Sequence, residues 1–108
     1  MSERRRSVRR ARRQGSAILS GYIVTWDVAS ENTALCARLR RYIFGYTSRK
    51  GGKAYRYPGF VERAGVRYLG QSVLFVSPAL LSVLRAYLRS ETVDHVVIEA
   101  SVGPVLPN

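Results

Sequence analysis

The order in which apolar spacings follow one another along this 108-residue chain limits the folds that it can adopt. The first clear pattern is the alternation of residues 21–28. One side of that segment is formed by Tyr22, Val24, Trp26 and Val28. Alternation of this kind predicts a strand with one buried face. Because that face must be covered by another layer, the elements that follow decide the fold.

A helix is predicted directly after this strand. Ser30 is a suitable N-cap for a helix that begins at Glu31, whose carboxylate is favoured near the positive end of the helix dipole. The apolar stripe of the helix is formed by Leu35, Leu39 and Ile43, with Cys36 beside them as a core residue. Gly45 is expected to end the helix.

The middle of the chain predicts two further strands. Residues 48–52 read as a flexible basic loop, and Lys53–Val61 follows as an aromatic and basic segment. Pro58 lacks a backbone N–H, which makes this segment an edge strand or a broken one. Val66–Val76 is a clearer strand, with a bulge expected at Gly70.

The last third of the chain predicts one more helix and one more strand. Ser77 and Pro78 form a strong helix start, because serine caps a helix and proline is tolerated at its first position. The apolar stripe of that helix is formed by Leu80, Leu81, Leu84, Tyr87 and Leu88. Val93–Val102 alternates again and predicts the final strand.

Strand, helix, strand, strand, helix, strand is the order of a ferredoxin-like βαββαβ sandwich. The predicted fold class is therefore α+β, with an antiparallel sheet, two helices on one of its faces and the other face open. Residues 21–104 are assigned to this single domain, and residues 1–20 to a basic arm that is flexible or becomes ordered on RNA. The open face is a natural platform for RNA or for a protein partner.

Charge indicates the kind of partner. Eighteen Lys and Arg residues against seven Asp and Glu residues give a net charge of +11, with residues 1–15 at +6 and residues 38–67 at +8. Dense basic blocks favour a polyanion, because each cation that neutralises a phosphate releases counterions. The alternatives are a solvated tail and an anionic membrane, and the arm has no large apolar face to insert into a membrane.

The residues predicted to bind RNA lie in these two blocks. In the arm they are Arg4, Arg5, Arg6, Arg9, Arg10, Arg12 and Arg13. In the second block they are Arg38, Arg41, Arg49, Lys50, Lys53, Tyr55 and Arg56, of which Arg38 and Arg41 share a helix face and are expected to act together. Arginine grips phosphate bidentately, and rings interleaved with cations stack on splayed bases. Alternatively, Tyr55 and Tyr57 are strand residues packed on the sheet.

Few residues suit catalysis. Cys36 is the only cysteine and His95 the only histidine, which disfavours a disulfide scaffold and a zinc site. Asp27 is a candidate metal ligand or general base, but no second acid lies close to it in the sequence, and a surface or capping role is the alternative. His95 is interpreted as a polar residue of the last strand. No catalytic residue, metal site or protein-bound cofactor is therefore predicted.

Several short segments resemble the Pop five family, the small ferredoxin-like protein subunit of archaeal and eukaryotic ribonuclease P. Residues 22–32, Tyr-Ile-Val-Thr-Trp-Asp-Val-Ala-Ser-Glu-Asn, resemble the opening strand and helix cap of that family. Residues 39–45 look like its helix end at Phe-Gly, and residues 72–76 look like its short apolar strand before the second helix. Residues 101–103 lie where the family ends its last strand, and an Arg-rich arm precedes the first.

The resemblance spans residues 20–104 and implies a function. It implies an RNA-binding subunit of ribonuclease P that assists the catalytic RNA in removing the 5′ leader of precursor tRNA. A TIM-barrel protein subunit is the implied partner, a homodimer contact within the assembly is open, and magnesium is expected at the RNA. Two positions depart from the family: Phe75 stands where an arginine is frequent, and Val102-Gly103-Pro104 replaces the closing Ser-Gly-Thr.

Two other functions stay open. One is the CRISPR-associated Cas two family, a metal-dependent nuclease or integration subunit, because Asp27 and residues 71–75 look somewhat like its motifs. The other is a small ribosome- or chromatin-associated binding protein. No apolar run approaches the roughly 18 residues of a membrane span, so a cytoplasmic location without membrane partners is predicted.

Overall fold

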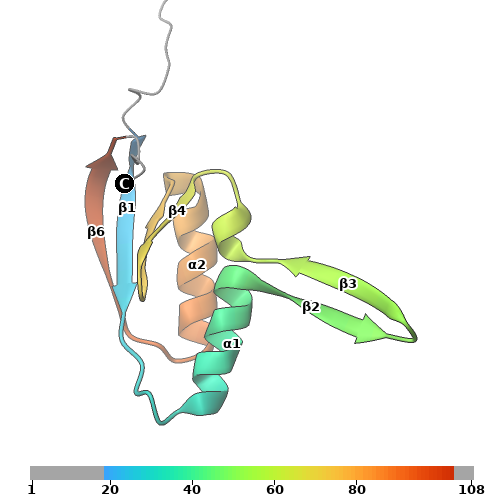
Figure 1. The fold of residues 1–108 in the computed structure, drawn as a ribbon. Coiled ribbons are helices and arrows are strands. Elements are labelled where there is room, and N and C mark those ends of the chain that lie inside the picture. Colours follow the sequence, from blue (N-terminus) through green and yellow to red (C-terminus); the bar gives the residue numbers. More distant parts are fainter. Residues whose placement is uncertain (1–18, 104–108) are drawn as a thin grey trace, which may run out of the picture.

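The computed structural model describes residues 19–103 (Figure 1). The elements in chain order are β1 (Leu19–Trp26), α1 (Thr33–Phe44), β2 (Gly45–Lys50), β3 (Lys53–Pro58), the 3-10 helix η3 (Phe60–Glu62), β4 (Val66–Gly70), β5 (Val73–Val76), α2 (Pro78–Ser90) and β6 (His95–Val102). The arginines predicted to form the arm, from Arg4 to Arg13, lie outside the described residues.

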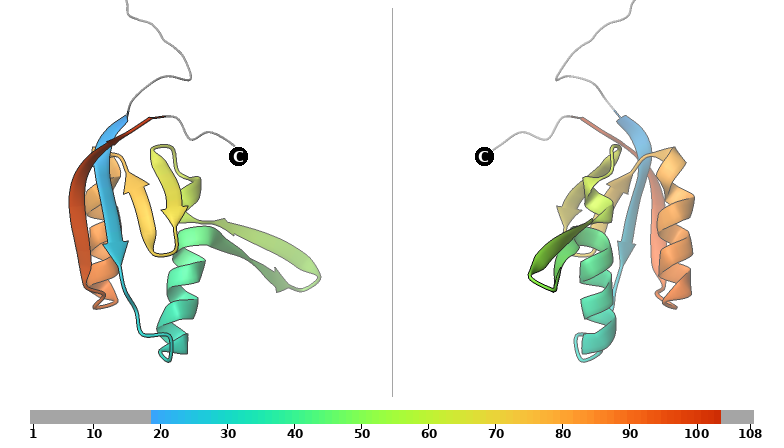
Figure 2. Two further views of the ribbon diagram at one scale, coloured as in Figure 1. Left: turned by 60° about the vertical axis from the view of Figure 1, so that its left-hand side comes forward. Right: turned by 90° about the vertical axis from the view of Figure 1, so that its right-hand side faces the viewer.

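Four of the strands form an antiparallel sheet in the order β4-β5-β1-β6. β1 pairs with β5 from Tyr22 opposite Val76 to Thr25 opposite Val73, and it pairs with β6 along its whole length. Both helices lie on one face of this sheet (Figure 2). The left view of Figure 2 shows the opposite face of the sheet, and the right view shows the helices in front of the sheet. The predicted α+β class, antiparallel sheet and pair of helices are thereby confirmed.

The predicted order of elements is wrong in the middle of the chain. Residues 66–76, predicted as one strand, form two strands that pair with each other around Gln71 and Ser72. The chain reverses at Ser72, which has a φ of 61°. Because apolar residues stand on both sides of this turn, their spacing does not reveal the reversal. The bulge expected at Gly70 is confirmed by a register shift between Tyr68 and Gly70.

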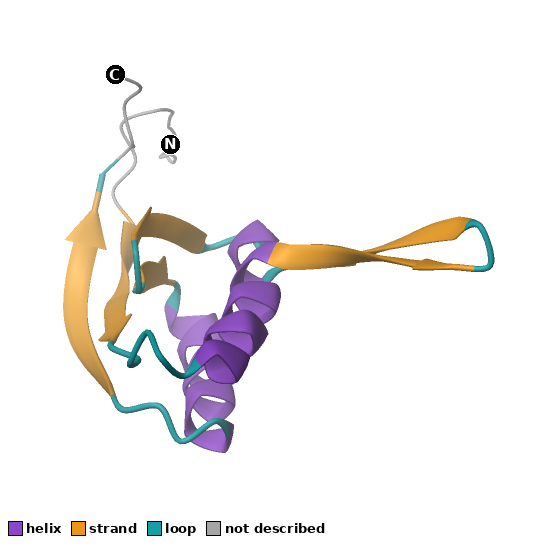
Figure 3. Ribbon diagram, turned by 60° about the horizontal axis from the view of Figure 1, so that its bottom comes forward, coloured by secondary structure: helices purple, strands orange, loops and turns teal. Residues whose placement is uncertain are grey.

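The second correction concerns residues 53–61, which were expected to lie in the main sheet. Only residues 53–58 form a strand, and they pair with residues 45–50 in a separate two-stranded sheet. This β2–β3 hairpin projects from the helix layer away from the main sheet (Figure 3). Its strands are largely exposed, so they lack the buried apolar face from which strands are usually recognised. The loop expected over residues 48–52 is reduced to the two residues of the hairpin turn.

The core fills the space between the main sheet and the two helices. Five residues of this core have no exposed surface, namely Val24, Leu74, Val76, Leu84 and Leu88. The stripe predicted for α1 is confirmed, because Leu35, Leu39 and Ile43 are all buried. The alternation predicted for β1 is confirmed too, since Tyr22, Trp26 and Val28 pack against the same core.

The ends of the helices follow the predicted signals with one exception. Asn32, not Ser30, caps α1, because its side-chain oxygen accepts a hydrogen bond from the Leu35 N–H at 3.3 Å. Ser30 lies in the preceding turn. Gly45 ends α1 with a φ of 81°, as predicted. Ser77 stands at the N-cap position of α2 before Pro78, as predicted, but its side chain makes no capping hydrogen bond to the helix.

Polar side chains join the two helices at their outer surface. The Tyr42 and Tyr87 rings stack with their centroids 3.7 Å apart. Glu91 accepts hydrogen bonds from the Arg38 guanidinium at 2.9 Å and from the Tyr87 hydroxyl at 3.2 Å. Burial and the neighbouring Glu91 carboxylate raise the pKa of Tyr87 to about 12, whereas the hydrogen bond from Arg38 lowers the pKa of Glu91.

The raised pKa of Tyr87 predicts alkaline sensitivity. The unfolded chain ionises this tyrosine near its ordinary pKa of 10.0, while the folded chain keeps the proton until about pH 12. Below pH 10, Tyr87 should therefore not lower the free energy of unfolding, as measured by urea titration. As the pH rises from 10 towards 12, this free energy should fall. Tyr87→Phe should reduce this loss, and Tyr55→Phe, at an exposed position, should leave it unchanged. An equal loss in Tyr87→Phe would contradict the assignment.

The core predicts a large effect of truncation at β5. Leu74 has no exposed surface, so Leu74→Ala should lower the free energy of unfolding by about 2–5 kcal/mol. Leu69 on the neighbouring strand is 41% exposed, and Leu69→Ala should change stability by about 0.5 kcal/mol or less. Chemical denaturation of both variants checks the prediction. Similar losses in the two variants would show that the assigned core is misplaced.

Candidate nucleic-acid interface

The β2–β3 hairpin forms because its turn and its register agree. The strands pair without a break from Gly45 opposite Pro58 to Lys50 opposite Lys53. The two residues between the strands, Gly51 and Gly52, have φ values of 57° and 82°. Two-residue turns with positive φ at both positions match the twist of the flanking strands, and glycine adopts them without strain. The Gly-Gly pair thus closes the hairpin.

One side of the hairpin combines tyrosines with lysines. Because cross-strand partners share a side, this side is formed by Tyr46, Ser48, Lys50, Lys53, Tyr55 and Tyr57, and we call it the tyrosine–lysine side. The Tyr46 and Tyr57 rings stack with their centroids 4.8 Å apart. Tyr55 and Tyr57 are 45% and 44% exposed, so they are not packed on the main sheet. The structure therefore leaves these rings open to a partner.

Arg56, on the other side of the hairpin, is held at the hairpin base. Its guanidinium donates to the Glu62 carboxylate at 2.6 Å, to the carbonyls of Phe44 and Tyr46 at 3.4 and 3.3 Å, and also to the Tyr57 carbonyl. The same Glu62 oxygen accepts a hydrogen bond from the Gly59 N–H at 2.7 Å. Arg56 was predicted to bind RNA, and the structure places it in a contact that fixes the hairpin to the core.

Arg38 and Arg41, which were expected to act together, contact different partners in the structure. Arg38 binds Glu91 beyond the end of α2 at 2.9 Å. Arg41 lies over the Tyr46 ring, with its guanidinium carbon 5.5 Å from the ring centroid. Arg41 therefore extends the tyrosine–lysine side towards α1, whereas Arg38 joins the two helices.

The predicted residues that come together are those near the tip of the hairpin. Lys50, Lys53 and Tyr55 share its tyrosine–lysine side, and Arg49 lies next to them on the other side. Within residues 19–103 these three cations make no ion pair with another side chain. Sequence reasoning missed Tyr46 as the partner of Tyr57, although the Gly51-Gly52 pair flanked by polar and aromatic residues was a signal for a hairpin.

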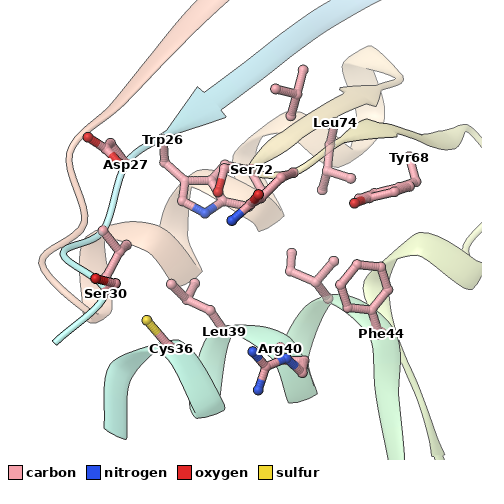
Figure 4. Close-up of a pocket in the computed structure, with 14 residues that line it drawn as sticks. Trp26, Asp27, Ser30, Cys36, Leu39, Arg40, Phe44, Tyr68, Ser72 and Leu74 are labelled. Carbon is pink, nitrogen blue, oxygen red and sulfur yellow. The ribbon is translucent and has the colours of Figure 1, made fainter. Parts of the chain in front are cut away.

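A cavity of about 230 Å³ opens beside the base of the hairpin, between α1 and the end of β1 (Figure 4). Aromatic rings line part of it, namely Trp26, Phe44 and Tyr68, and the Phe44 and Tyr68 rings meet edge to face with centroids 5.3 Å apart. Arg40 lies on its α1 side. Cys36, predicted as a core residue, is only partly buried and lines the cavity instead.

The other singled-out residues have ordinary surroundings. Asp27 is exposed, and in the described part of the chain no three His, Cys, Asp or Glu side chains gather as ligands of a metal ion. His95 accepts a hydrogen bond from Arg85 at 3.3 Å and lies 3.0 Å from the Val93 carbonyl. Phe75 is 1% exposed and its ring lies over the backbone of Gly21, so this position offers no contact to RNA. Among the described residues, no helix has the length and apolar composition to cross a membrane.

Comparison of the chain with protein-family models, with curated proteins and with solved structures finds no match. The function of the chain must therefore be inferred from its own residues and geometry.

Proposed function

We propose that this protein binds RNA through the β2–β3 hairpin. The observation that carries the proposal is the tyrosine–lysine side, which projects from the core. Its exposed rings share one surface with lysines that make no ion pair within residues 19–103. A ring can stack on an unpaired base while the cations beside it hold the phosphates. Exposed tyrosines add no core packing, so a partner accounts for them better than folding does.

Charge on the hairpin supports the same proposal. Residues 45–58 contain four cations and no acid. Lys50 and Lys53 are direct cross-strand partners, and like charges in that position destabilise a hairpin. A phosphate between the two ammonium groups relieves this repulsion, so the arrangement is favourable when an anionic partner is bound.

We further propose that the RNA is that of ribonuclease P and that the protein assists its removal of the 5′ leader of precursor tRNA. The segments resembling the Pop five family support this assignment. So does the topology: without the β2–β3 hairpin, the elements follow the order of a ferredoxin-like sandwich. In this proposal the RNA binds magnesium and supplies the chemistry in the cytoplasm, and the protein acts as its chaperone.

A protein partner has a separate surface in this proposal. Val96 and Ile98 of the edge strand β6 are 56% and 51% exposed and point to the face of the sheet away from the helices. An apolar surface of this kind suits a protein contact rather than phosphate binding. We assign it to the TIM-barrel subunit, which leaves the hairpin free for RNA.

The hairpin lysines predict the salt dependence of binding. Replacing Lys50 and Lys53 together by alanine should weaken RNA binding and reduce the slope of log K against log salt by about 1.4 if each contacts one phosphate of a single strand. The charge-matched control is Arg85→Ala combined with Arg89→Ala on α2, which should preserve the slope. Filter-binding or anisotropy titrations over a salt series measure both. Equal slopes for the hairpin variant and the wild type would contradict the proposal.

The basic arm predicts a second and independent contribution. Removal of residues 1–15, which carry net +6, should flatten the salt dependence further in the same titrations. The sheet and hairpin lie outside this segment, so circular dichroism should show an unchanged fold. An unchanged slope after the removal would exclude the arm from the RNA contact.

A further inference from the structure

The cavity beside the hairpin has the shape and lining of a small binding site. Its upper wall is the end of β1 with Trp26, its lower wall is α1 with Leu39 and Arg40, and Phe44 and Tyr68 stand at one end (Figure 4). Its volume of about 230 Å³ suits one flat ring system rather than an extended ligand. Aromatic walls of this kind suit a flat, polarisable guest.

Two features of the lining point to a ligand. Phe44 and Tyr68 are 44% and 52% exposed, so their edge-to-face pair leaves much of each ring available. The Trp26 indole nitrogen lies on the side of the ring that faces α1 (Figure 4), and its N–H makes no hydrogen bond to a residue within 19–103. Because Trp26 is only partly buried, this donor is accessible to a guest in the cavity.

Polar groups are available for the edge of such a ring. The turn between β4 and β5 brings Gln71 and Ser72 to the cavity, and Ser30 lines it from the loop before α1. Amide and hydroxyl groups of this kind both donate and accept hydrogen bonds. Arg40 also lines the cavity and is exposed, so its guanidinium can bind a phosphate attached to the base.

We propose that this cavity holds one unstacked nucleobase of the RNA strand that the hairpin binds. Phe44 lines the cavity, is the last residue of α1 and directly precedes β2, so the cavity lies next to the base of the hairpin. Arg41, which lies over Tyr46, is close to this junction on α1. The inference rests on the proposed RNA binding and adds a site that takes a base instead of a phosphate.

The test uses Trp26, the single tryptophan of the chain, as its reporter. Hexameric adenylate and uridylate RNA, an abasic hexamer with the same number of phosphates, and free AMP are titrated while the tryptophan emission is followed. Binding of the hexamers is measured in parallel by competition with a labelled RNA. Tyr68→Ala and Phe44→Ala remove walls of the cavity, and Leu69→Ala, at a neighbouring exposed position that does not line it, is the matched control.

A base in the cavity predicts a saturable change in Trp26 emission with at least one RNA hexamer and none with the abasic hexamer, although the abasic hexamer still competes. Tyr68→Ala or Phe44→Ala should weaken the affinity reported by Trp26 about fivefold or more, as expected for loss of a stacking ring. Leu69→Ala should leave it unchanged. Urea denaturation establishes that the variants are folded.

The inference is overturned if the abasic hexamer changes the emission as RNA does, or if both cavity variants bind like the wild type. If RNA binds and depends on Lys50 and Lys53 while Trp26 does not respond, the proposed function stands and the base site falls. If RNA does not bind but AMP changes the emission in a manner that requires Tyr68, the cavity takes a free nucleotide, and both the proposed function and the base site for an RNA strand fall. If neither the hexamers nor AMP change the emission, the base site is excluded.

Discussion

The point where the hairpin leaves the core is the constraint on which the proposed interface depends. A Cβ atom at Gly59 would overlap the backbone of Ile43 and Phe44, so α1 and the chain after β3 approach each other closely only because this residue is glycine. Glu62 then ties the site together by accepting from both the Gly59 N–H and Arg56. An isolated two-stranded hairpin is marginal in water, and these contacts give it a fixed direction.

Contacts within the fold reduce the number of cations that are available to a partner, so the net charge of +11 overstates the charge of the candidate interface. Arg38 and Arg56 are held by glutamates, and Arg41 lies over a tyrosine ring, so these three cations have roles within the fold. Exposed ion pairs contribute only about 1 kcal/mol or less, but they fix where a side chain points. Among the cations that were predicted to bind RNA and that lie within residues 19–103, Arg49, Lys50 and Lys53 make no such contact, and all three lie near the hairpin tip. Position, rather than total charge, therefore defines the candidate interface.

Elements with a buried face could be predicted from the sequence. The alternation of β1 and the stripes of both helices follow directly from burial, which is why Val24, Leu39 and Leu84 are found in the core. The β2–β3 hairpin buries almost nothing, so apolar spacing carries no signal for it, and only the Gly51-Gly52 turn indicates the reversal. The turn at Ser72 was missed because apolar residues continue on both sides of it.

The candidate site was predictable in its residue types and not in its arrangement. Interleaved tyrosines and cations identified Lys50, Lys53 and Tyr55, but only strand register shows that these three share one side. The cavity depends on packing between α1 and the end of β1, which no local pattern encodes. Residues far apart in the sequence, such as Trp26 and Tyr68, line the same cavity because of the sheet order.

Mapping the RNA contact residue by residue tests the central claim most directly. Backbone amide chemical shifts of the full-length protein are followed while a structured RNA or a short single strand is added. The account predicts that the largest changes fall within residues 45–58, with further changes at the mouth of the cavity, and that α2 and β6 are little affected. Changes concentrated on the open face of the sheet, with residues 45–58 unperturbed, would contradict it.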